Sequence, residues 1–231
     1  MSSQPQRPSV TADENLAAGI GADRSQMLRL LSADLRPAFE ALFQVDAAMG
    51  DVVARATQPA LGSVKLAWWR ERLEELDQGM VPAEPRLRAV AEHLLPRGVK
   101  GAELAELEDG WATLLEEQVE PRRIADRGAA LFRLGGRLLG TDDEKLGDAG
   151  ALAALVSVGR RCRPDLLAYA GDYERPLVRH RFTRRLRPLT ALARLAIRDL
   201  RSGPPFEPEG TPPRVAAMLR HRWSGIVLRG N

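Results

Sequence analysis

The chain has 231 residues, of which 44% are hydrophobic and 5% aromatic, and its formal net charge is +3. This length and apolar content suit one large domain with a sizeable core. Leu, Ala, Glu and Arg dominate the composition and favour helices, so we expect an all-α protein. The small net charge does not indicate nucleic-acid binding. A single cysteine, Cys162, excludes an intrachain disulfide and favours a reducing compartment.

The N-terminal segment is rich in Ser, Gln, Pro, Ala and Gly and lacks the apolar stretch of a secretory signal. We expect a disordered tail over residues 1–22, followed by one helical domain over residues 23–231. No apolar run approaches the ~18 residues that a membrane span needs. The expected location is therefore the cytoplasm, and any membrane contact is expected to be peripheral.

Apolar residues at helical spacing predict four helices in the first hundred residues. We expect them over residues 23–34, 37–56, 59–79 and 85–95. The second helix carries an apolar stripe that includes Asp46, and the third carries Trp68 and Trp69, both of which we expect in the core. Pro37 and Pro59 suit the first turns of these two helices.

The second half of the chain continues the helical pattern. Helices are expected over residues 104–121, 122–139, 142–161 and 186–200, with a last one from residue 213, after a proline-rich loop over 203–213. Asp142 or Asp143 is expected to cap the helix that ends at Arg161. Between Arg160 and Arg187 there are nine arginines and three acids. This run is either a solvated face or a surface for anionic lipid, phosphate or an acidic partner.

Four segments carry a resemblance to a known family. They read KLAWWRERLEEL (65–76), ALFRLGGRLLG (130–140), RPLTALARLAIRDLRSG (187–203) and AAMLRHRWSG (216–225). Together they resemble the squalene/phytoene synthase superfamily over residues 23–225, and KLAWWRE is the strongest motif. The resemblance implies an isoprenoid synthase-like helical bundle around a central apolar cavity.

Enzymes of this family join two prenyl diphosphates, and Mg²⁺ held by two acid-rich patches on facing helices binds the leaving diphosphate. Aligned on the first patch, this sequence reads Gly50-Asp51-Val52-Val53-Ala54, in which only the second acid is kept. Asp46 and Asp51 are five residues apart, about 140° around a helix, so they are expected to diverge. Aligned on the second patch it reads Ser157-Val158-Gly159-Arg160-Arg161, with Arg161 in place of the key aspartate. Both metal clamps are therefore expected to be broken, with no metal cofactor and no catalytic residue.

One branch of the superfamily has such eroded acidic motifs, namely the assembly factors of respiratory complex I. The order from Phe43 through Gly62 to Trp69 resembles that branch. The resemblance implies a non-catalytic assembly or binding factor whose partner is a protein such as a respiratory complex subunit. It also implies a place at the inner membrane surface and a cavity able to hold a prenyl or other lipid-like ligand.

Two alternatives stay open. The first is an active head-to-head prenyl diphosphate synthase that uses Mg²⁺, with Asp46 and Asp51 as the first catalytic candidates. The second is a protein that binds a phosphate ligand without metal, with Arg55, Arg160 and Arg161 as the anion-binding candidates. A lone carboxylate in an apolar stripe is hydrogen-bonded, is paired with an arginine, or has a raised pKa. Asp46 is thus either half of a buried Asp–Arg pair or a remnant of a prenyl diphosphate cavity.

Overall fold

The computed structural model describes residues 19–230, and this part of the chain is mostly helical, with no strand beyond two isolated bridges. The predicted all-α class is confirmed. Of the predicted tail over residues 1–22, only the last four residues are among those described. Ile20 is buried, and the first described helix already begins at Ala22.

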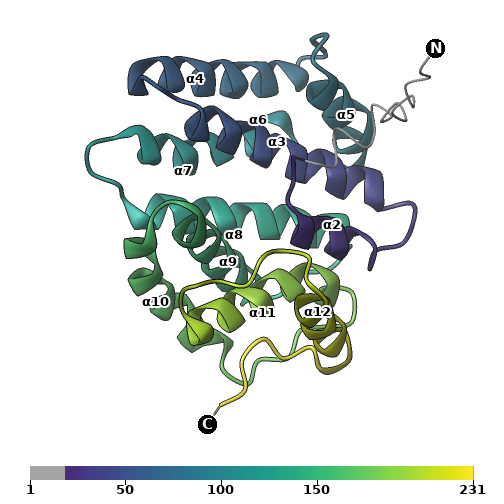
Figure 1. The fold of residues 1–231 in the computed structure, drawn as a ribbon. Helices are drawn as coiled ribbons and strands as arrows, with labels where there is room; N and C mark the ends of the chain where they lie inside the picture. Colours follow the sequence, from purple (N-terminus) through teal and green to yellow (C-terminus); the bar gives the residue numbers. More distant parts are fainter. Residues whose placement is uncertain (1–18, 231) are drawn as a thin grey trace, which may run out of the picture.

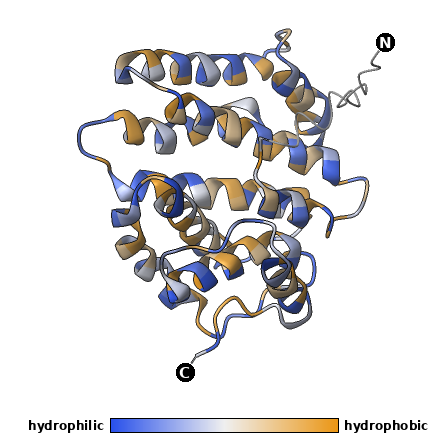
Figure 2. Ribbon diagram, viewed as in Figure 1, coloured by the Kyte–Doolittle hydropathy of each residue, from blue (hydrophilic) through white to orange (hydrophobic). Residues whose placement is uncertain are grey.

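The helices stack in successive layers (Figure 1). The first layers contain α3 (Arg36–Ala54), α4 (Pro59–Leu76), α5 (Pro85–His93), α6 (Gly101–Ala105) and α7 (Asp109–Ala112). Below them lie α2 (Ala22–Leu28), α8 (Pro121–Leu138), α9 (Leu146–Arg161), α10 (Ala170–Glu174), α11 (Arg187–Ser202) and α12 (Pro212–Ser224). The hydropathy colouring shows both polar and apolar residues on each long helix, as expected where one face packs inward (Figure 2).

Helices α8 and α9 approach each other closely at the level of the backbone. A Cβ atom on Gly150 would lie 2.1 Å from the carbonyl oxygen of Gly128, and a Cβ on Gly128 would lie 2.3 Å from that of Gly150. Only glycine permits this approach at either position. The contact fixes α9 against α8 and so sets the distance between two walls of the cavity described below.

Several predicted boundaries are wrong, for local reasons. The helix expected over 104–121 alternates between α-helical and 3-10 turns and ends at Leu115, and beyond it the Thr113 hydroxyl accepts a hydrogen bond from the Glu120 N–H (2.8 Å). The helix expected over 23–34 ends at Leu28, and in the turn that follows it the Arg36 guanidinium donates to the Leu31 carbonyl. Neither Asp142 nor Asp143 caps α9, which begins at Leu146.

The two adjacent tryptophans of α4 have different surroundings. Trp69 is buried, as predicted, but Trp68 is 41% exposed, which contradicts the expectation that both lie in the core. Consecutive helical residues point about 100° apart, so one layer of neighbours covers only one of them.

Candidate functional site

A cavity of about 300 Å³ lies between α3, α8 and α9 and is closed by residues of α2 and α7. Its charged lining consists of Arg24, Asp46, Asp51, Arg127 and Arg161. The two segments that were aligned with the acid-rich patches, on α3 and α9, thus line one common cavity. Its walls also carry apolar groups, so the cavity is amphipathic in character.

Asp46 is fully buried at the wall of this cavity. Its Oδ2 lies 2.6 Å from Arg24 Nη2, and its Oδ1 accepts a hydrogen bond from Trp111 Nε1 at 3.0 Å and forms an ion pair with Arg127. Burial alone raises the pKa of Asp46, but Arg127 and Arg24 outweigh it and lower that pKa to about 2. Asp46 is therefore ionised at neutral pH and forms ion pairs with two arginines, which agrees with the interpretation of a buried Asp–Arg pair.

Arg127 is the most enclosed cation of the cavity. Its guanidinium lies 3.9 Å from the ring centroid of Trp111, a cation–π contact. Its Nε is buried without a hydrogen-bond acceptor among the described residues. Burial lowers the pKa of Arg127, and Asp46 counteracts that effect. One N–H of a buried guanidinium thus lacks an acceptor within residues 19–230.

The α3 wall offers a single further carboxylate. Asp51 lines the cavity, but its side chain is half-exposed and pairs with Arg55 of the next turn at 3.6 Å. Asp46 and Asp51 therefore reach one cavity in spite of their angular separation, yet each has its own arginine partners. Gly50 has no room for a side chain, because a Cβ there would lie 2.8 Å from the Trp111 ring. Ala54 completes this wall with a methyl group.

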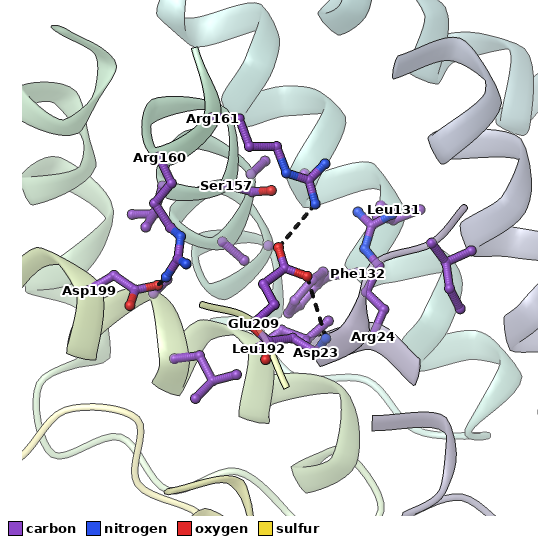
Figure 3. Close-up of a pocket in the computed structure, with 18 of the residues that line it drawn as sticks. Asp23, Arg24, Leu131, Phe132, Ser157, Arg160, Arg161, Leu192, Asp199 and Glu209 are labelled. Atoms are coloured by element: carbon purple, nitrogen blue, oxygen red, sulfur yellow. Dashed lines mark hydrogen bonds and ion pairs between the residues drawn. The ribbon is translucent and has the colours of Figure 1, made fainter. Parts of the chain in front are cut away.

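The facing wall, on α9, is basic. Ser157 and Arg161 line the cavity, and Arg161 pairs with Glu209 at 3.1 Å (Figure 3). Arg160 turns instead toward α11, where it pairs with Asp199 and donates to the Glu207 carbonyl at 2.7 Å. Both of these anion-binding candidates thus already hold a carboxylate. The third candidate, Arg55, points outward with 83% of its side chain exposed.

A smaller hollow of about 70 Å³ adjoins the cavity and contains a buried ion network (Figure 3). Arg214 lies at its centre and pairs with Asp23 and with Asp199, each at 2.6 Å. Sequence patterns do not indicate this cluster, because Asp23 and Arg214 are 191 positions apart. No periodic pattern relates residues at such a separation.

No metal centre is evident within residues 19–230, where no group of three or more His, Cys, Asp or Glu side chains is arranged to hold an ion. Over the same residues, no helix combines the length and the apolar character that a membrane crossing requires. Comparisons of the chain with protein-family models, with curated proteins and with solved structures found no match.

Proposed function

We propose that this protein is a non-catalytic binding protein built like a squalene/phytoene synthase, with an assembly role of the kind found in the complex I branch. The observation that carries the proposal is the set of residues that line the cavity where the resemblance calls for acids. Gly50, Ala54 and Arg161 occupy three of these positions, and Asp51 alone is an acid.

The electrostatics of the cavity argue against binding of a divalent cation. Mg²⁺ prefers several oxygen ligands in octahedral geometry and loses its waters reluctantly. Here the carboxylate of Asp46 is neutralised by Arg24 and Arg127, and Arg161 stands on the facing wall. A cation entering the cavity would meet three guanidinium groups and, besides Asp46, one carboxylate, that of Asp51, which Arg55 already contacts.

An assembly role needs a surface for a protein partner, and the outward face of α4 exposes apolar side chains that suit one. Leu61, Val64 and Trp68 follow one another at helical spacing and are 54%, 68% and 41% exposed. The opposite face of the same helix is buried, so α4 is apolar on both sides. Contiguous exposed apolar residues commonly mark interaction sites.

Turnover measurements test the absence of catalysis. The purified chain is incubated with Mg²⁺ and labelled farnesyl or geranylgeranyl diphosphate, and released diphosphate is measured. We expect no release above the protein-free rate. Release that disappears in Asp51→Ala, but persists in the matched surface variant Asp126→Ala, would refute the proposal and establish the synthase alternative.

Capture experiments test the assembly role. Tagged chain is recovered from its native host, and the bound proteins are identified for wild type and for Val64→Ser/Trp68→Ser. We expect respiratory complex subunits with wild type and their loss with the variant, whereas the control Met80→Ser/Val81→Ser, also at exposed apolar residues, keeps them. Recovery of isoprenoid-pathway enzymes in their place would contradict the assembly role.

Metal-free binding of a phosphate ligand is a second candidate, which the unpaired Nε of Arg127 favours. A ligand oxygen at that atom would satisfy a buried donor that otherwise costs about 1–3 kcal/mol. Thermal unfolding with farnesyl diphosphate tests it. Equal stabilisation with and without Mg²⁺ supports metal-free binding, and stabilisation only with Mg²⁺ excludes it.

A further inference from the structure

Two segments near the C-terminus contain no acidic residue. Residues 175–198 and 210–231 together carry twelve arginines and no Asp or Glu. The structure brings these segments together. Helices α11 and α12 pack against each other, the Phe182 N–H donates to the Gly225 carbonyl at 2.9 Å, and the Arg179 N–H donates to the Leu228 carbonyl at 2.9 Å. Two acid-free stretches therefore form one continuous part of the molecule.

Four of the twelve arginines are buried or half-buried. Of these, Arg187 and Arg194 donate to backbone carbonyls, and Arg198 and Arg214 pair with carboxylates. The other eight are exposed, and none of them forms an ion pair with a described residue, although Arg181 and Arg222 each donate to a backbone carbonyl. No acid within residues 19–230 pairs with these eight arginines. Arg160 and Arg161 differ from them, because Arg160 pairs with Asp199 of α11 and Arg161 pairs with Glu209 of the loop before α12.

An exposed tryptophan lies among these arginines. Trp223 is 82% exposed, and Leu219, one turn earlier on α12, is 45% exposed. Arg184, Arg222 and Trp223 line a hollow of about 250 Å³. Arg184 and Arg222 also line a neighbouring hollow of about 330 Å³ together with Arg185. We call Arg181, Arg184, Arg185, Leu219, Arg222 and Trp223 the α12 surface.

The C-terminal end of α12 is held in place by a buried arginine of α11, Arg187. Arg187 Nη1 donates to the carbonyls of Arg222 (3.0 Å) and Trp223 (2.9 Å), and Arg181 Nε donates to that of Ser224 (2.9 Å). These bonds satisfy carbonyls that the end of α12 would leave without partners. Burial lowers the pKa of Arg187, and Arg181 and Arg184 lower it further, which reflects the crowding of positive charge here.

We propose that the α12 surface binds an anionic lipid bilayer, with Trp223 and Leu219 at the level of the headgroups and the four arginines on lipid phosphates. Tryptophan is enriched at membrane–water interfaces because its ring is apolar and its N–H is polar. Clustered arginines near a membrane surface are attracted to anionic lipids. A nucleic acid would use the arginines, but it has no acyl region to receive Leu219. This binding does not depend on the function of the cavity.

Sedimentation with vesicles tests the proposal on the full chain. We expect binding to vesicles of phosphatidylcholine mixed with phosphatidylglycerol, weak binding to phosphatidylcholine alone, and a decline with added salt. Removing one arginine from such a contact weakens partitioning roughly fivefold. Arg184→Gln/Arg185→Gln is therefore expected to weaken binding by more than tenfold.

Matched variants separate this surface from charge in general. Arg88→Gln/Arg122→Gln removes two exposed arginines from elsewhere and is expected to leave binding unchanged. Trp223→Ala is expected to weaken binding to anionic vesicles without altering its salt dependence, and thermal unfolding verifies that each variant is folded. Equal loss in both arginine pairs, no effect of Trp223→Ala, or stronger binding to a single-stranded oligonucleotide or an acidic peptide than to anionic vesicles would each overturn the proposal.

Discussion

Replacing Asp46 by Asn keeps the size of the side chain but removes the charge that offsets Arg24 and Arg127. Arg127 is almost completely buried, so water cannot compensate for the loss. Removing one partner of a buried ion pair costs about 3–5 kcal/mol, mostly because the other charge is left unpaired. We expect Asp46→Asn to lower the free energy of unfolding in urea at pH 7 by this amount.

The pH dependence of the wild-type free energy of unfolding gives a second estimate of how much the charge of Asp46 contributes to stability. The pKa of Asp46 falls from its usual 3.8 to about 2 in the folded state. A group with a depressed folded pKa stabilises the protein above its unfolded pKa, and this stability is lost as pH falls toward the folded value. The shift corresponds to roughly 2–3 kcal/mol, lost between about pH 4 and pH 2. Asp46→Asn should lack this step.

Two further variants make the Asp46 prediction refutable. Asp51→Asn changes a half-exposed aspartate on the same helix and should cost less than about 1 kcal/mol. Arg127→Met removes the buried cation, so Asp46→Asn should cost much less in that background than in wild type. A cost below about 1 kcal/mol for Asp46→Asn, or additive effects in the double variant, would refute the buried ion pair.

Changes at three glycines and at His221 also have defined outcomes. Gly50→Ala should destabilise the fold by about 1–3 kcal/mol, because its methyl group would collide with Trp111, and Trp111→Ala should relieve this penalty in a urea-unfolding comparison. Gly150→Ala, whose methyl group would meet the backbone of α8, should be at least as damaging, whereas Gly171→Ala in open space should stabilise α10 by about 0.5–1 kcal/mol. Burial lowers the pKa of His221 to about 4, so stability should fall by roughly 3 kcal/mol as pH drops from 6.5 to 4, and His221→Gln should abolish that loss.

Local periodicity was enough to predict the long helices, but not the short α10. The stripe Leu66, Trp69, Leu73 and Leu76 is buried throughout, as its spacing indicated. Periodicity does not tell how many faces of a helix are covered, and Trp68 is exposed for that reason. Close to one helix end that differs from the prediction, the Arg36 guanidinium donates to the Leu31 carbonyl, a contact that no pattern encodes.

The resemblance indicated which helices line the candidate site, but it did not indicate which arginines pair with Asp46. Sequence alignment placed Asp51 and Arg161 in the two relevant segments, and both line one cavity. The partners of Asp46 come from 22 positions earlier and 81 positions later in the chain. The basic run from Arg160 to Arg187 was interpreted either as a solvated face or as one binding surface. Its first two arginines pair with Asp199 and Glu209, and the charge without an ion pair lies with α12.

Because Asp46 pairs with Arg24 and Arg127 in the cavity, replacing any one of these three residues is expected to destabilise the fold. Losing Asp46 leaves two arginines uncompensated, and losing Arg127 removes a cation that stacks on Trp111. Each single loss costs more than the intact pair contributes, because it leaves a buried charge without its partner. Stability alone is therefore sufficient to keep Asp46 in place. A buried aspartate in an apolar stripe is accordingly no argument for catalysis here. Two other features have no such structural explanation: the Nε of Arg127, which has no acceptor among the described residues, and the arginines of the α12 surface, which have no acidic partner there.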